Sequence, residues 1–298
     1  YHLVRRDEFR GRDHMAAAKL AVIVNATALL KLHGLGNDFL VVANPSEEIG
    51  DEHARAWCDR HTGIGADGLL VLRSGGRAGA DLDMQLINAH GGTAEMSGNG
   101  IRCLVHAAYV EKLVDGDRVS VDTDAGRREV VVVAGDTATQ LWQRVDMGVA
   151  RDGGPLPSVV ERLVPGARVA ALDMGNPHVI VGLDHVDVVT AFDLAAVGAA
   201  IENAVPGGVN VSVIAASSDD AIRLRVWERG VGLTQACGTG ACAAAVAATR
   251  WGWVQGRVRV QQPGGDAVVH VGARVELEGP TVLVARCEAF VVVAATGS

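Results

Sequence analysis

Two short glycine-rich segments each place a small polar side chain directly before an apolar, alanine-rich run. Cys237 precedes Gly238-Thr239-Gly240, and Ser97 precedes Gly98-Asn99-Gly100. If a helix begins at such a segment, its unpaired backbone N–H groups and partial positive charge can hold a carboxylate or lower the pKa of a thiol. Cys237 is therefore the best candidate for a reactive residue, with an inert buried cysteine as the alternative interpretation.

The same two segments belong to an internal repeat. Cys237 lies 140 residues after Ser97, and Gly175-Asn176-Pro177-His178 lies 139 residues after the similar Gly36-Asn37-Asp38-Phe39. Asn88 and Glu228 add to the repeat, because each stands nine residues before its glycine-rich segment and directly after a strand-like run. A spacing kept over this length predicts two homologous halves.

Two equivalent helix starts that face each other suggest a specific chemistry. They could grip one amino-acid carboxylate between them and place a side chain from each half on opposite faces of its α-carbon. A proton could then leave from one face and return to the other, which is racemisation or epimerisation. This scheme needs no pyridoxal phosphate, and we expect no cofactor.

Composition narrows the classes of partner. The chain has 298 residues, a formal net charge of −8, 37 glycines and five cysteines. The acidic balance argues against a nucleic-acid partner, and no apolar run reaches the ~18 residues that would predict a membrane span. The cysteines form no CxxC pair, so we expect no metal site, and we expect reduced thiols in a cytoplasmic protein. Residues 1–25 look like a leader or tag, disordered in part.

The expected secondary structure is rich in strands. Helices are expected at about residues 51–59, 100–113, 193–201 and 240–251. Short β-branched runs bounded by Gly, Pro, Asp or Asn predict strands through most of the remaining chain, and KLHGLGNDFLVV predicts a strand, a turn and a second strand. The pattern favours a mostly antiparallel sheet around one apolar helix in each half.

The motifs in order resemble diaminopimelate epimerase, within the cofactor-independent group that includes proline racemase. They are KLHGLGNDF, TGIGADG, INAHGGTAEMSGNGIRC, MGNPH, NVS and WERGVGLTQACGTGACA. The resemblance implies an α+β fold of two pseudosymmetric domains, each a barrel-like sheet around a central helix, with the active site between them. We expect these domains at residues 26–143 and 144–280, with a strand at residues 281–296 that returns to the first, and we expect a homodimer.

The resemblance also implies roles for individual residues. Cys237 and the residue at position 97 would be the two catalytic groups, supported by His178 and Glu228. The backbone N–H groups of Gly98, Asn99, Gly238 and Thr239 would take the reacting carboxylate. The side chains implied in binding the amino acid are Asn37, Asn88, Asn176, Asn210, Glu228 and Arg229.

Ser97 departs from the family pattern, which has a cysteine at this position. A serine hydroxyl has no alkoxide population near pH 7, so one of the two acid/base groups is missing and activity should be low. Three explanations stay open: an engineered Cys→Ser change, which a vector-like leader would fit; a natural relative with one-sided chemistry, such as a dehydratase or lyase acting on a hydroxylated imino acid; or a non-catalytic amino-acid-binding paralogue. The leading hypothesis is an epimerase that interconverts LL- and meso-2,6-diaminopimelate, in the supply of lysine and cell-wall precursors.

Overall fold

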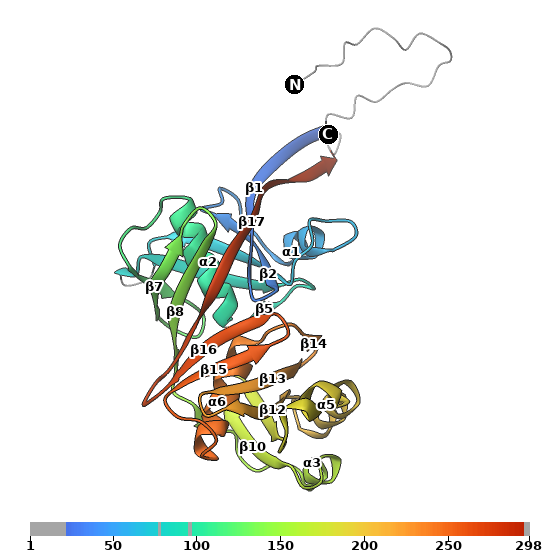
Figure 1. Cartoon of the computed structure of the whole chain (residues 1–298). Helices are drawn as coiled ribbons and strands as arrows, with labels where there is room; N and C mark the ends of the chain where they lie inside the picture. The colour runs from blue at the N-terminus through green and yellow to red at the C-terminus, as the bar shows by residue number, and fades with distance from the viewer. Residues whose placement is uncertain (1–21, 77–78, 95–96, 295–298) are drawn as a thin grey trace, which may run out of the picture.

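The computed structural model describes residues 22–76, 79–94 and 97–294, which fold into two lobes (Figure 1). The predicted leader at residues 1–25 falls almost wholly outside the described part, and the first strand begins at Val22. The helices are α1 (Asp51–Cys58), α2 (Gly98–Val110), α3 (Ser158–Leu163), α4 (Val186–Ala191), α5 (Leu194–Ala204) and α6 (Gly238–Arg250).

The strands divide between the lobes, and β17 connects the two. Those of the first half are β1 (Val22–Gly34), β2 (Asn37–Ala43), β3 (Gly68–Ser74), β4 (Leu82–Asn88), β5 (Thr93–Ala94), β6 (Arg118–Asp122), β7 (Arg128–Asp136) and β8 (Gln140–Gly148). Those of the second half are β9 (Arg151–Asp152), β10 (Arg168–Asp173), β11 (Pro177–Gly182), β12 (Asn210–Ser218), β13 (Ala221–Glu228), β14 (Gly232–Thr234), β15 (Arg257–Gln262), β16 (Gly265–Val271) and β17 (Val275–Ala294). Strand β17 pairs with β16 and β8 at its start and with β1 over its remaining length, so it runs from one lobe to the other (Figure 1).

The strand pairing repeats between the halves. In the first half β2 pairs in parallel with β3 and β4 with β6; in the second half β11 pairs in parallel with β12 and β13 with β15. The other described pairings are antiparallel, and all strands belong to one continuous sheet. The predicted α+β fold with two pseudosymmetric, mostly antiparallel lobes is confirmed.

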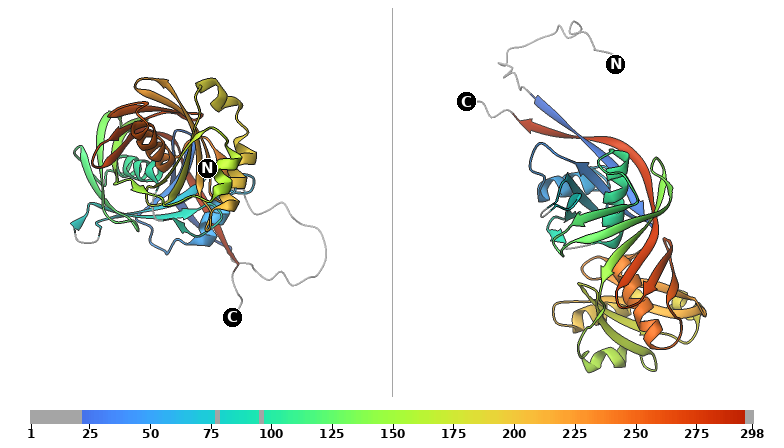
Figure 2. Two further views of the ribbon diagram at one scale, coloured as in Figure 1. Left: turned by 90° about the horizontal axis from the view of Figure 1, so that it is seen from below. Right: turned by 90° about the vertical axis from the view of Figure 1, so that its left-hand side faces the viewer.

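Each lobe wraps its strands around one apolar helix. All residues of α2 from Gly98 to Ala108, and all residues of α6 from Gly238 to Ala248, are buried. Both helices belong to the same hydrophobic core, and a view along the long axis shows them lying within the strands (Figure 2). A helix that is buried on every side must lack a polar face, and the alanine run of α6 meets that requirement while strongly favouring helix.

Helix boundaries differ slightly from the prediction. Helices α2 and α6 begin at Gly98 and Gly238, two residues before the predicted starts. The prediction left these residues out because glycine generally disfavours helix, but in the structure they form the first turn. The short helices α3 and α4 were not predicted. Each has six residues, which is too short for a helical period to stand out, and both pack on the separate core beneath β11 and β12.

Candidate functional site

The two glycine-rich segments form matching helix starts. Ser97 is the N-cap of α2, with φ −136° and ψ 124°, and Cys237 is the N-cap of α6, with φ −128° and ψ 118°. The Ser97 Oγ accepts the N–H of Gly100 at 3.0 Å, and the Cys237 Sγ accepts the N–H of Gly240 at 3.4 Å. The residue at each position is therefore held in the same way by its own helix.

The two helix starts meet at the interface between the lobes. A Cβ added to Gly238 would lie 3.4 Å from the Cα of Gly98 and 2.9 Å from the Cδ2 of Leu277. A Cβ added to Gly98 would lie 2.8 Å from the same Leu277 methyl group. Glycine is needed at both positions because the helix ends approach this closely. Their free N–H groups therefore converge on one place, which is suited to an anion.

A cleft of about 570 Å³ opens at this junction. Its volume suits a small organic ligand. Eleven of the thirteen predicted site residues line it: Asn37, Asn88, Ser97, Gly98, Asn176, Asn210, Glu228, Arg229, Cys237, Gly238 and Thr239. The side chains of Asn99 and His178 are not among the lining groups and lie buried behind it, at 2% and 1% exposure.

The pKa of the Cys237 thiol is raised in this structure, contrary to the expectation of a lowered pKa. Cys237 is 5% exposed, and burial raises the pKa of its thiol well above the ordinary value, to which the nearby Glu228 charge adds. The N–H of Gly240 and the hydroxyl of Thr239 act in the opposite direction but are outweighed. The helix end stabilises a thiolate, whereas loss of water and a facing carboxylate destabilise it more.

Glu228 is the carboxyl group that interacts with Cys237. Burial raises the pKa of the Glu228 carboxyl, and hydrogen bonding by Thr234 and Cys237 lowers it in part. The hydroxyl of Thr234 donates to Glu228 Oε1 at 2.6 Å, which fixes the carboxyl at the end of β13. The raised pKa makes the Glu228 carboxylate a better acceptor for the Cys237 proton, whereas the raised pKa of the thiol opposes this transfer.

His178 supports the cleft from behind. Its Nε2 lies 2.9 Å from Asn176 Oδ1, so the hydrogen on Nε2 is donated to that oxygen and orients the Asn176 side chain in the cleft. Burial lowers the pKa of His178 to about 4, so the ring is neutral near pH 7. In this tautomer Nδ1 is a bare acceptor, and it has no hydrogen-bond partner among the described residues.

Elsewhere in the cleft, the Asn210 side chain on β12 connects the start of β11 with Arg229, which directly follows β13. The Asn210 Nδ2 donates to Pro177 O at 3.0 Å, and its Oδ1 accepts the backbone N–H of Arg229 at 3.0 Å. The Arg229 guanidinium reaches Gly207 O at 3.3 Å and also lines the cleft. A planar guanidinium at this place can bind a carboxylate through two hydrogen bonds.

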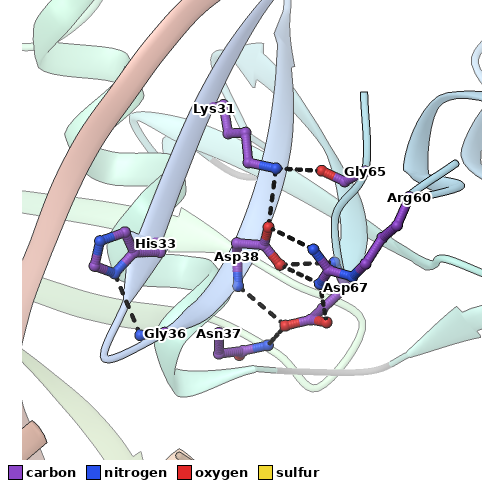
Figure 3. Close-up of polar contacts among 8 residues, drawn as sticks. All are labelled: Lys31, His33, Gly36, Asn37, Asp38, Arg60, Gly65 and Asp67. Atoms are coloured by element: carbon purple, nitrogen blue, oxygen red, sulfur yellow. Dashed lines mark hydrogen bonds and ion pairs between the residues drawn. The ribbon is translucent and has the colours of Figure 1, made fainter. Parts of the chain in front are cut away.

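An ion-pair network on the first lobe was not predicted (Figure 3). Arg60 binds Asp38 and Asp67, with its Nη2 at 2.7 Å from an oxygen of each, and Lys31 Nζ lies 3.0 Å from Asp38 Oδ2. Asp67 accepts from Asn37 Nδ2 at 2.8 Å. Arg60 and Asp67 both line the cleft, so this network supports Asn37 from one side. The TGIGADG motif contained Asp67, but sequence spacing alone did not join it to Asn37 and Arg60.

This network gives the protein a stability that depends on pH. Arg60 and Lys31 hold the pKa of Asp38 below its ordinary value despite burial. A carboxyl with a lowered folded-state pKa contributes its full stabilisation above its unfolded pKa of about 4 and loses it as the pH falls through the folded-state value. We expect Asp38→Asn to lower the free energy of unfolding by about 2 kcal/mol at pH 7. Denaturant unfolding from pH 2 to 7 should show this difference shrinking below pH ~4; a constant difference would contradict the assignment.

The sequence of this chain is similar to that of known proteins. The sequence profile of diaminopimelate epimerase matches residues 29–152 and 170–284. A diaminopimelate epimerase of Azotobacter vinelandii is 40% identical over 249 residues, covering 79% of this chain and 87% of that protein. The chain belongs to the diaminopimelate epimerase family. This membership makes it an isomerase.

Other members of the diaminopimelate epimerase family extend the match. The protein of that name from Heliobacterium modesticaldum is 38% identical over 283 residues, which cover 87% of this chain and 98% of that protein.

Among solved structures, a predicted epimerase from Pseudomonas aeruginosa superposes with a TM-score of 0.68 at 15% identity, over 88% of this chain and 99% of that one. A hydroxyproline epimerase from Agrobacterium vitis superposes with a TM-score of 0.65 at 15% identity, over 90% of this chain and 93% of that one. At such identities the solved structures show a shared fold.

Two further observations concern the whole described chain. No helix in residues 22–76, 79–94 and 97–294 is long and apolar enough to cross a membrane. Within the same ranges, no group of three or more His, Cys, Asp or Glu side chains is arranged to hold a metal ion.

Proposed function

We propose that this protein interconverts LL- and meso-2,6-diaminopimelate by proton transfer at one α-carbon, without a cofactor. The observation that carries the proposal is the pair of matched helix starts that meet at Gly98 and Gly238, with Ser97 and Cys237 at equivalent N-caps. The converging N–H groups would hold the α-carboxylate and stabilise the charge that develops when the α-proton leaves. The residues at positions 97 and 237 would then face opposite sides of that carbon.

The raised pKa of the Cys237 thiol determines which group must gain or lose a proton in each direction of the reaction. In one direction the Cys237 thiol gives its proton to the α-carbon while a base at position 97 removes the original proton. In the other direction Cys237 must first be a thiolate, and we propose that Glu228 takes the thiol proton, because burial raises the pKa of this carboxyl and makes its carboxylate a better proton acceptor. Ser97 cannot serve as the opposing base near pH 7. We therefore propose that epimerisation by this chain is slow.

Side chains that can bind the second ammonium and carboxylate of the substrate favour diaminopimelate over shorter amino acids. Arg229, Asn88 and Asn210 all line the cleft and can bind a second ammonium and carboxylate. A proline-sized ligand has no distal ammonium to bind. The competing function, loss of water from a hydroxylated imino acid, is favoured only by the presence of a single competent base.

A comparison of ligands tests the function. We expect meso-diaminopimelate to bind about 10- to 100-fold more tightly than 2-aminopimelate, which lacks the distal ammonium, because a charge-assisted hydrogen bond contributes about 1.5–3 kcal/mol. Isothermal titration calorimetry measures both affinities, and Arg229→Leu should weaken the binding of both ligands, because both carry the distal carboxylate. Equal affinities, or formation of a pyrroline product from trans-3-hydroxyproline, whose hydroxyl lies on the carbon next to the α-carbon, would favour the competing function instead.

We also propose a homodimer in the cytoplasm. The arm formed by β1 and β17 extends beyond the first lobe in both views (Figures 1 and 2), and Phe290 on it is 60% exposed. A large exposed aromatic residue on a paired strand supports burial against a second copy.

The five cysteines are free, which supports a reducing compartment such as the cytoplasm.

A further inference from the structure

A fully buried arginine lies directly behind the α2 helix start. Arg102 is 0% exposed, its Nε and Nη1 have no hydrogen-bond partner among the described residues, and it forms no ion pair with any of them. Its one side-chain hydrogen bond runs from Nη2 to Asn99 Oδ1 at 2.7 Å. Burial lowers the pKa of the guanidinium to about 10, so it remains a cation near pH 7. A buried cation without a counter-ion is costly, and its retention calls for a role.

Arg102 begins a chain of hydrogen bonds that runs into the cleft. Asn99 Nδ2 donates to Asn37 Oδ1 at 3.2 Å, and Asn37 Nδ2 donates to Asp67 Oδ2 at 2.8 Å. Asp67 is fixed in turn by Arg60 at 2.7 Å (Figure 3). Of the two asparagines, Asn37 lines the cleft while Asn99 is enclosed.

The direction of this chain is set at both ends. A guanidinium can only donate, so the Asn99 oxygen must face Arg102 and its NH₂ group must face Asn37. A carboxylate can only accept, so the Asn37 NH₂ group must face Asp67. Both ends impose the same orientation on Asn37, which leaves one N–H and one lone pair of its amide for a ligand in the cleft.

Among the described residues, this chain of hydrogen bonds is found in the first half alone. By the internal repeat, Asn99 corresponds to Thr239 and Arg102 to Cys242. Thr239 turns toward Cys237, with its Oγ1 3.6 Å from the sulfur, rather than into the interior. Room for the guanidinium comes from Gly279 on β17, where an added Cβ would lie 3.4 Å from Arg102 Nη2.

We propose that Arg102 is a positioning residue that fixes the amides of Asn99 and Asn37 from the interior, so that Asn37 presents a set donor and acceptor to the amino-acid substrate. The substrate named here rests on the proposed function, but the orientation of Asn37 does not.

Three variants test this role. Arg102→Met removes the first link, and Asn99→Asp removes the second while keeping a partner for Arg102. The new carboxylate in Asn99→Asp would pair with the guanidinium, so this variant should fold, yet it cannot donate to Asn37. Leu104→Ala is the control, because Leu104 is equally buried on the same helix and takes no part in the chain.

The first measurement needs no ligand. In ¹⁵N–¹H correlation spectra the side-chain amide signal of Asn37, identified by its loss in Asn37→Asp, should shift in Arg102→Met and Asn99→Asp. It should stay in place in Leu104→Ala, and the Asn210 signal should stay in all three, because that amide is held by Pro177 and Arg229. An unchanged Asn37 signal in folded Asn99→Asp would overturn the proposal, even if Arg102→Met failed to fold.

The second measurement is affinity for meso-diaminopimelate. We expect its Kd to rise about tenfold in Arg102→Met and Asn99→Asp and to stay within about twofold in Leu104→Ala, because one oriented hydrogen bond to a charged ligand is lost. If the unaltered protein did not bind diaminopimelate, the proposed function would fail while the spectra still decided the role of Arg102. If it bound and both variants kept its Kd, the positioning role would be wrong.

Discussion

Replacing Ser97 with cysteine is expected to raise the rate of epimerisation by about 10²–10⁴-fold, the usual contribution of a general acid or base. The N-cap geometry at position 97 matches that of Cys237 to within about 10° in φ and ψ, so a thiol can occupy the place of the hydroxyl without moving the backbone. Chiral chromatography of LL- and meso-diaminopimelate over time gives the rate.

The matched control for this prediction is Ser97→Ala, which removes the hydroxyl and adds no base. It should epimerise at the same low rate as the unaltered protein. If Ser97→Cys were no faster than Ser97→Ala, position 97 would not hold a catalytic group. If the unaltered protein already equalled Ser97→Cys, serine would be competent there and the slow-turnover proposal would be wrong.

The second large effect is expected at Cys237. In the Ser97→Cys background, Cys237→Ala should lower the rate by about 10²–10⁴-fold, because the remaining thiol then has no partner on the opposite face. The side chain is buried and small, so the substitution should change the fold little. Affinity for meso-diaminopimelate should fall less than tenfold, since the helix N–H groups that hold the carboxylate remain.

A loss of affinity as large as the loss of rate would contradict this prediction, because Cys237 would then act in binding. Cys242→Ala is the control. Cys242 lies on the same helix and is fully buried in the core, where burial raises the pKa of its thiol to about 12. It should leave the rate within about twofold.

The sequence predicted the parts of the site that depend on local chemistry. The turn between β1 and β2 was recognisable from Gly-Leu-Gly-Asn, and in the structure Leu35 and Gly36 take φ values of 56° and 86°, which glycine favours at the second position. The repeat placed Ser97 and Cys237 at equivalent positions because a duplicated fold keeps its spacing. Eleven predicted residues accordingly line one cleft.

The remaining features depend on contacts that no local pattern encodes. Arg102 belongs to an apolar helical run, and an arginine there gives no sign of whether it is buried. The link between Asn37 and Asp67 spans 30 residues and depends on the parallel pairing of β2 with β3. The pKa of Cys237 was expected to fall from its place at a helix start, but the depth of burial and the facing Glu228 determine its direction.

Isotope exchange tests the central claim, that two opposed half-sites share one α-carbon and only one of them carries a competent base. LL- and meso-diaminopimelate are incubated separately with the unaltered protein in D₂O, and deuterium at the α-carbons is measured by NMR and mass spectrometry. We expect deuterium uptake in one of the two isomers, with retention of configuration and almost no conversion, whereas Ser97→Cys should incorporate deuterium with inversion from both. Rapid inversion of both isomers by the unaltered protein would contradict the account.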